Sequence, residues 1–216
     1  MSYIKANFNN LDFVALNNIE KYKIAKPFSH IIIDDFFKEE ILNNIIEDFP
    51  KDLEKIGDKF NNKTELKFGL NDPRKLSYQT NNFINFLNSS IFINFLQKLT
   101  SINKNLIPDP YLLGGGLHEL KNSGFLNIHA DFNRQPKMNL DRRLNILIYL
   151  NKSWDERNGG QLELWDKDMK KCIQSIVPIF NRMVIFSTTS FSYHGNPNKV
   201  NCANSNSRKS IALYYY

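Results

Sequence analysis

Only four histidines occur in this chain, at positions 30, 118, 129 and 194, so few residues are candidates for metal binding. His129 lies in the segment FLNIHADFN, two residues before Asp131. In a β-strand, residues i and i+2 project from the same face, so this imidazole and this carboxylate can reach one metal ion. The pair alone is a weak signal, because a strand-end histidine beside a solvated aspartate gives the same pattern.

His194 supplies a second imidazole, between the strand-like segment MVIFSTTSFSY and the turn GNPN. Two histidines and one carboxylate occupy three positions of an octahedron and leave three open, which suits non-haem Fe(II) and oxygen chemistry. Arg208 begins the segment RKSIALYYY, 14 residues after His194. A guanidinium binds a carboxylate through two hydrogen bonds and keeps its charge. A 2-oxo-diacid that chelates the metal at one end needs such an anchor at the other.

Strands must position these residues, and from Pro108 onward the sequence consists of short β-like runs separated by turns such as Gly195–Pro197. This spacing is typical of a double-sheet jelly roll. We therefore predict an α+β fold, with a double-stranded β-helix (jelly-roll) core at 108–216 braced by helices from residues 1–107 of the same domain. The predicted strands are 111–119, 124–131, 143–151, 160–165, 172–177, 182–187, 190–195 and 208–215.

The residues before Pro108 predict the supporting elements. A buried strand is expected in 28–37, a helix in 38–49 that a proline ends, and two short helices in 81–100. Residues 1–27 predict an extended or partly helical lead-in. Residues 51–80 are charged and poor in apolar side chains, which favours a long irregular loop of the kind that often binds ligands.

Composition narrows the class of protein. The chain has 216 residues, of which 42% are hydrophobic, and this supports one medium domain. Its net charge is +6, but the basic residues are scattered, so nucleic acid is not an expected partner. Cys172 and Cys202 form no metal or disulfide pattern, and no apolar run reaches the roughly 18 residues that span a bilayer. We expect a soluble cytoplasmic protein with no membrane partner; its oligomeric state stays open.

The order His129-x-Asp131, His194, Arg208 resembles the Fe(II)/2-oxoglutarate-dependent oxygenases, in particular their prolyl 4-hydroxylase-like branch. The segments RRLNILIYLNKSWDERNGGQLELWD, FNRMVIFSTTSFSYHGNP and RKSIALYYY are similar to successive segments of that branch. The resemblance covers residues 108–216 in order, and residues 28–50 resemble the strand and helix that precede the core.

This resemblance implies a role for each matched residue. His129, Asp131 and His194 would hold Fe(II), and Arg208 with Tyr149 would anchor the far carboxylate of 2-oxoglutarate. O2 would be the other co-substrate. The expected reaction hydroxylates an unactivated C–H bond and releases succinate and CO2.

Strand parity groups further side chains with these. Asn145 shares a face with Tyr149 on one predicted strand, and Tyr214 shares a face with Arg208 on the last. Asn145 is therefore a candidate for co-substrate binding, and Tyr214 for substrate binding. The alternative for both tyrosines is ordinary sheet packing. Ile211, on the opposite face, is expected to pack outside.

One departure from the branch concerns the strand before His129, where many members have a tyrosine. Here the segment reads LHELKNSGFLNIH, and His118 is the candidate for the corresponding co-substrate contact. The alternative is a structural histidine, which is also the interpretation of His30.

Three hypotheses for the function stay open: a hydroxylase of a peptidyl residue, of which proline is the one the branch name suggests; a hydroxylase of a small molecule; and a non-catalytic jelly roll that binds a ligand. The intact ligand set argues against the third. Basic side chains in 51–80 and 132–142 suggest an acidic or anionic substrate, with Arg134 as a candidate contact, or else a solvated face. These side chains are Lys59, Lys63, Lys67, Arg74, Lys75, Arg134, Lys137 and Arg142.

Overall fold

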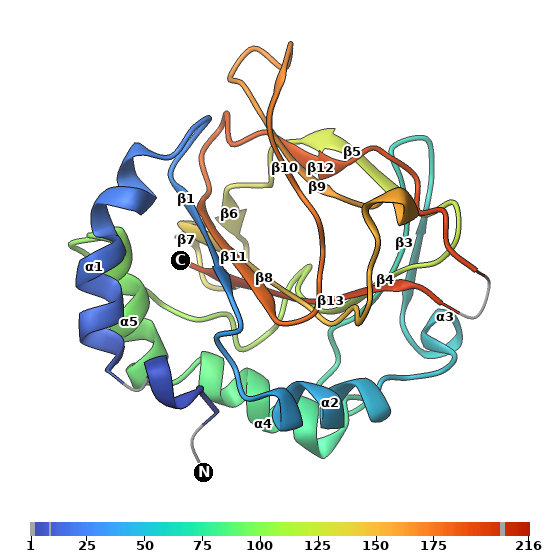
Figure 1. The fold of residues 1–216 in the computed structure, drawn as a ribbon, viewed down its shortest axis with the longest axis horizontal. Helices are drawn as coiled ribbons and strands as arrows, with labels where there is room; N and C mark the ends of the chain where they lie inside the picture. Colours follow the sequence, from blue (N-terminus) through green and yellow to red (C-terminus); the bar gives the residue numbers. More distant parts are fainter. Residues whose placement is uncertain (1–2, 9, 204–205) are drawn as a thin grey trace.

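In the part of the chain that the structure describes, an antiparallel sheet of eleven strands forms the centre and curls on itself (Figure 1). The computed structural model describes residues 3–8, 10–203 and 206–216. The strands pair in the order β1–β11–β8–β13–β4–β3–β5–β12–β9–β10, and β2 pairs with β3. Their bounds are β1 His30–Asp34, β2 Asp58–Asn61, β3 Glu65–Leu70, β4 Gly116–Leu120, β5 Phe125–His129, β8 Leu144–Tyr149, β9 Leu162–Trp165, β10 Cys172–Ile176, β11 Arg182–Ser187, β12 His194–Asn196 and β13 Arg208–Tyr215. A separate small hairpin joins β6 Arg134–Gln135 to β7 Leu140–Asp141.

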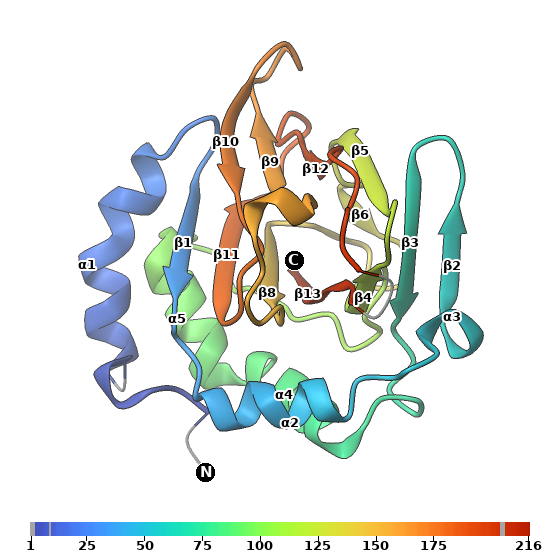
Figure 2. The ribbon, with the colours of Figure 1, turned by 45° about the vertical axis from the view of Figure 1, so that its right-hand side comes forward.

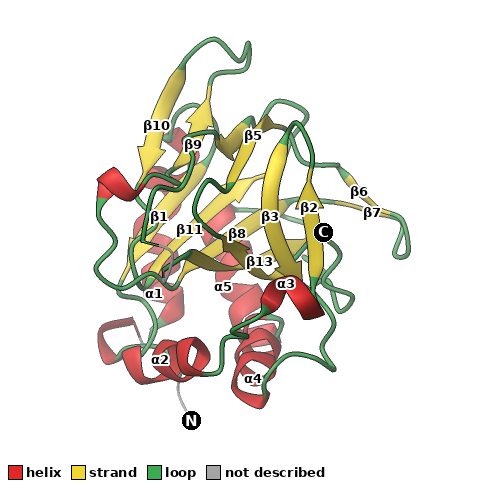
Figure 3. Cartoon of the chain, turned by 90° about the vertical axis from the view of Figure 1, so that its right-hand side faces the viewer, coloured by secondary structure: helices red, strands yellow, loops and turns green. Residues whose placement is uncertain are grey.

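Helices cover the outer side of this sheet (Figures 2 and 3). α1 packs against α5 and against β1, and α2 packs against α4. The bounds are α1 Leu11–Ile24, α2 Glu39–Glu47, α3 Leu53–Ile56, α4 Tyr78–Leu87 and α5 Ser90–Thr100, with 3-10 turns at Ala6–Phe8 and Glu156–Asn158. None of the helices in the described part of the chain is long and apolar enough to cross a membrane.

Alternation along the strands gives the sheet two different faces. Ile146, Ile148, Ile211 and Leu213 point outward and belong to the same buried cluster as the helix residues. The residues between them point inward, and Ser210 pairs with Tyr149 across β13 and β8. Burial of the outer face against the helices therefore fixes which side chains can reach the interior. The outward packing predicted for Ile211 is confirmed.

The predicted α+β jelly-roll class is confirmed, since the sheet is a curled antiparallel half-barrel with the N-terminal helices packed against it. Each predicted strand overlaps an observed one, although β12 lies toward the end of the predicted 190–195 run. Cys172 and Cys202 are free thiols. The cytoplasmic location stays a prediction.

The prediction for residues 51–80 was wrong. This segment contains α3 and the β2–β3 hairpin, and β3 joins the main sheet between β4 and β5. Its sequence ELKFGL alternates apolar residues with Glu65, Lys67 and Gly69, which is the period of a half-buried strand. The charged composition of the surrounding loop concealed this alternation.

Candidate active site

The two metal-binding candidates on neighbouring strands are placed opposite each other by sheet pairing. His194, the first residue of β12, pairs with His129, the last residue of β5, and their ring centroids are 4.7 Å apart. Asp131 follows two residues after β5. One ligand atom from each of these three residues lies within 4.8 Å of the others. Strand register thus assembles residues that are 65 positions apart in the sequence.

Both histidines are oriented by backbone carbonyls. His129 Nδ1 lies 2.9 Å from Asn127 O, and His194 Nδ1 lies 2.9 Å from Ser192 O. Because a carbonyl only accepts hydrogen bonds, Nδ1 carries the proton in each ring and Nε2 keeps its lone pair. Each Nε2 faces Asp131, at 3.5 Å from Oδ1 for His129 and 3.7 Å from Oδ2 for His194. This is the tautomer that a metal ligand requires.

The electrostatics of the cluster suit a divalent cation. Burial alone would raise the pKa of the Asp131 carboxyl, but His194, His129 and Arg142 outweigh it and hold that pKa well below its usual range. Burial lowers the pKa of His194. The carboxylate is therefore ionised and His194 neutral at neutral pH. Burial lowers the pKa of His129, but its contact with Asp131 outweighs burial and raises that pKa. Two imidazole nitrogens, once unprotonated, and one carboxylate fit Fe(II) with open positions for further ligands.

Two residues near the start of β8, Arg142 and Asn145, contact the carboxylate of Asp131. Asn145 Nδ2 donates to Asp131 Oδ2 at 3.0 Å, and Arg142 Nη1 lies 3.1 Å from the same oxygen. The Arg142 side chain is fully buried, and its guanidinium lies over the rings of Tyr214 and Phe132, at 3.6 and 4.0 Å from their centroids. The sequence interpretation of Arg142 as part of a basic loop for an anionic substrate was wrong.

Replacing Asn145 by leucine should weaken iron binding without unfolding the protein. The substitution keeps the side-chain size but removes the hydrogen bond that orients Asp131, and loss of such a contact typically costs about tenfold in metal affinity. Anaerobic titration with Fe(II) measures the effect. The control is Asn133→Leu, at an exposed position. If Asn145→Leu binds Fe(II) with wild-type affinity, Arg142 alone orients the Asp131 carboxylate.

A small cavity of about 60 Å³ extends inward from the metal ligands. Arg208 lies in its wall, is buried, donates to Gly160 O at 2.8 Å and has no carboxylate partner among the described residues. Ser210 Oγ and Asn196 Nδ2, also in this wall, are buried without hydrogen-bond partners. A buried cation and unpaired polar atoms are costly unless an anion binds them. The cavity therefore fits a carboxylate-bearing ligand that also reaches the metal, as 2-oxoglutarate does.

Three further residues predicted as binding candidates, two of them by strand parity, lie around this cavity. Tyr149 is fully buried behind Arg208, whose Nη2 donates to the tyrosine hydroxyl at 3.4 Å. Tyr214 lines the cavity and donates its hydroxyl to Gly114 O at 3.1 Å. His118 also lines it, with Nε2 3.1 Å from the same carbonyl. Their roles in binding stay predictions.

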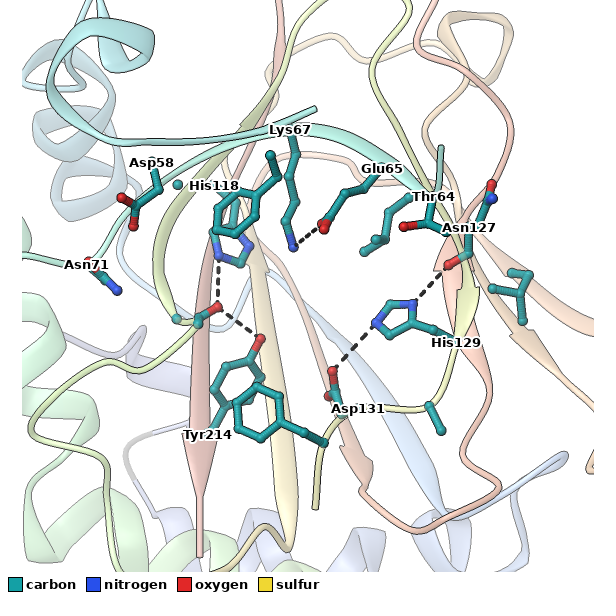
Figure 4. A pocket seen from close by; sticks show the side chains of 18 residues that line it. Asp58, Thr64, Glu65, Lys67, Asn71, His118, Asn127, His129, Asp131 and Tyr214 are labelled. Carbon is teal, nitrogen blue, oxygen red and sulfur yellow. Dashed lines mark hydrogen bonds and ion pairs between the residues drawn. The ribbon is translucent and has the colours of Figure 1, made fainter. Parts of the chain in front are cut away.

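A second, larger pocket of about 440 Å³ opens to solvent beside the same metal ligands (Figure 4). The β2–β3 hairpin forms one wall with Asp58, Phe60, Glu65 and Lys67. Of these, the sequence analysis had considered only Lys67, as one of several basic side chains that could attract an anionic substrate. Phe132 contributes to its rim and is 49% exposed. The period-two alternation of β3 was the signal that could have revealed these residues.

The basic side chains once expected to attract an anionic substrate mostly have partners within the chain. Arg134 lies on the exposed β6–β7 hairpin, is paired with Asp141 and lines neither cavity. The pairs are Lys59–Glu54, Lys67–Glu65, Arg74–Asp72, Arg134–Asp141 and Arg142–Asp131.

Comparison with known proteins places this geometry in a family. Residues 115–216 match the 2OG-Fe(II) oxygenase superfamily. Over 79 residues the chain is 33% identical to prolyl 3-hydroxylase OGFOD1 of Mus musculus. This alignment covers 35% of this chain and 14% of the mouse protein. The fold is similar to that of a Trichoplax adhaerens prolyl hydroxylase in complex with a hypoxia inducible factor peptide fragment, with a TM-score of 0.65 and 17% identity over 98% of this chain and 93% of that one.

A further structural neighbour is HygX of Streptomyces hygroscopicus, solved with nickel, 2-oxoglutarate and hygromycin B. It has a TM-score of 0.60 and 9% identity over 92% of this chain and 86% of that one. At these identities the two structures show a shared fold.

The family match includes every strand that carries the metal candidates and Arg208. The three metal ligands suit Fe(II), and the small cavity with Arg208 suits the far carboxylate of 2-oxoglutarate. The matched segment therefore retains the residues that bind the metal and the co-substrate. Residues 115–216, just under half of the chain, thus have both the sequence and the metal-ligand set of the 2OG-Fe(II) oxygenase superfamily.

Proposed function

We propose that the protein hydroxylates a residue within a polypeptide, with proline as the first candidate. The observation that carries this proposal is the larger pocket, which adjoins His129 and Asp131 and is open on its solvent side. An open pocket of this kind admits a side chain that is still part of a peptide, whereas an enclosed one would require a free small molecule. The prolyl hydroxylases among the similar proteins support the same substrate class.

When bound, Fe(II) and 2-oxoglutarate supply, with O2, the oxidising power that converts C–H to C–OH and yields succinate and CO2. The residues of this chain hold and orient these groups. His129, Asp131 and His194 would hold the metal, and Arg208 would hold the far carboxylate of the co-substrate. Between them, apolar side chains of the inner face such as Leu147 exclude bulk water from the small cavity.

A small amine-bearing molecule is the second candidate. Asp58 places a carboxylate in the wall of the larger pocket that would favour a cationic ligand, whereas Glu65 in the same wall is paired with Lys67. HygX, a neighbour in fold, was solved with hygromycin B bound.

The test uses the iron-loaded protein with 2-oxoglutarate and a library of proline-containing peptides. The expected result is peptide-dependent succinate release and a mass increase of one oxygen on a residue located by fragmentation. Asp131→Ala is the inactive control. Turnover with free amino acids or amine-bearing sugars, but with no peptide, would overturn the proposal in favour of the second candidate.

A further inference from the structure

Two cations face the small cavity, although the sequence pattern indicated only one. Arg208 on β13 was expected there, and Lys67 on β3 is the other basic residue in the cavity wall. A 2-oxo-diacid carries two carboxylates. A second cation in the wall therefore raises the question of which end of the co-substrate it binds.

Sheet register brings Lys67 to the interior. β3 pairs with β4 so that Gly69 lies opposite His118, and Glu65, Lys67 and Gly69 share the face that lines the larger pocket. Lys67 lines both cavities, whereas Glu65 lines only the larger one. Figure 4 shows the Lys67 side chain pointing into the site between His118 and His129.

Lys67 lies at the metal end of the cavity. It lines both the small cavity and the larger pocket, as do the metal ligands His129 and Asp131. Arg208, the cation expected to bind the far carboxylate, lines only the small cavity. The two cations are therefore separated along the cavity, with the metal ligands beside Lys67.

Two neutral groups near Lys67, the His118 ring and the Tyr214 hydroxyl, donate their hydrogen atoms to a backbone carbonyl. His118 donates from Nε2 to Gly114 O, and burial lowers its pKa to about 3, so Nδ1 carries only a lone pair. The Tyr214 hydroxyl donates to the same carbonyl. Lys67 has three N–H donors and a single salt-bridge partner, Glu65 Oε2 at 3.1 Å. It is thus the charged donor available to an anion at this end, in addition to the unpaired hydroxyl of Ser210, which lies opposite His118 on β13.

We propose that Lys67 is a positioning residue of the co-substrate site, whose ammonium group binds the carboxylate of 2-oxoglutarate next to the 2-oxo group, while Glu65 neutralises it in the absence of co-substrate. The dicarboxylate would then lie between two cations, Lys67 and Arg208. This inference rests on the family's co-substrate and is independent of whether the substrate is a peptide.

Binding of truncated co-substrates tests which end Lys67 holds. The Fe(II)-loaded protein is titrated anaerobically with 2-oxoglutarate and with 2-oxopentanoate, which lacks the far carboxylate, and the metal-to-ligand absorption band gives each Kd. Lys67→Met should raise both Kd values about tenfold, as expected for the loss of one charge-assisted hydrogen bond. Arg208→Met should raise the Kd of 2-oxoglutarate alone. Unchanged values in Lys67→Met, or a change confined to 2-oxoglutarate, would overturn the assignment.

Three further variants separate a local contact from a general effect of charge. Lys63→Met removes an exposed lysine from the same hairpin and should leave both Kd values unchanged. Lys67→Arg keeps the cation and should stay within about threefold of the wild type. Glu65→Gln frees Lys67 and should lower both Kd values, which keeps the proposal testable even if Lys67→Met does not fold. Unchanged or weaker binding in Glu65→Gln would contradict it.

Discussion

Asp131→Ala should abolish iron-dependent decarboxylation of 2-oxoglutarate, with a loss of at least about a thousandfold. Asp131 is the sole carboxylate of the ligand set, and its removal leaves two imidazoles, which hold Fe(II) weakly. Succinate formation measures the activity, and anaerobic Fe(II) titration shows whether the loss begins at metal binding.

The same substitution leaves Arg142 buried beside an empty position, so its effect on stability must be measured separately. Breaking a buried ion pair by removing one partner costs about 3–5 kcal/mol. Asp131→Asn keeps the side-chain volume and should lose activity with a smaller loss of stability. Asp141→Ala, at an exposed aspartate on the neighbouring hairpin, is the matched control. Full activity in either Asp131 variant would refute the assignment of the metal ligands.

Arg208→Met should raise the Kd of 2-oxoglutarate by about a hundredfold while Fe(II) affinity stays unchanged. Arg208 is buried and has no carboxylate partner among the described residues, so the co-substrate would provide its counter-charge. The methionine substitution keeps the apolar stem and removes only the charge and its donors. The anaerobic absorption titration gives both constants.

Arg208→Lys should restore part of the affinity, because it keeps the charge but loses the two-point geometry of the guanidinium. Arg157→Met, at an arginine whose side chain is 90% exposed, controls for the loss of one positive charge. A 2-oxoglutarate requirement unaltered by Arg208→Met would assign the far carboxylate to another residue.

The sequence alone predicts which side chains of a single strand point to the same face of the sheet. Because side chains alternate, the segment RKSIALYYY alone indicates that Arg208 and Tyr214 share a face and that Ile211 packs on the other. The spacing of His129 and Asp131 likewise depends only on local geometry. These predictions needed no knowledge of which strands are neighbours.

Residue types, local period and resemblance to a known family thus sufficed to indicate the fold class and to select His129, Asp131, His194 and Arg208 as candidates. The tertiary structure was needed to place β3 in the sheet between β4 and β5, and so to show that Lys67 faces the co-substrate cavity. It also decided that Arg142 is buried against Asp131 rather than exposed to substrate. Both outcomes depend on contacts between segments far apart in the chain, which no local pattern specifies, because the same charged side chain is equally compatible with solvent and with a buried partner.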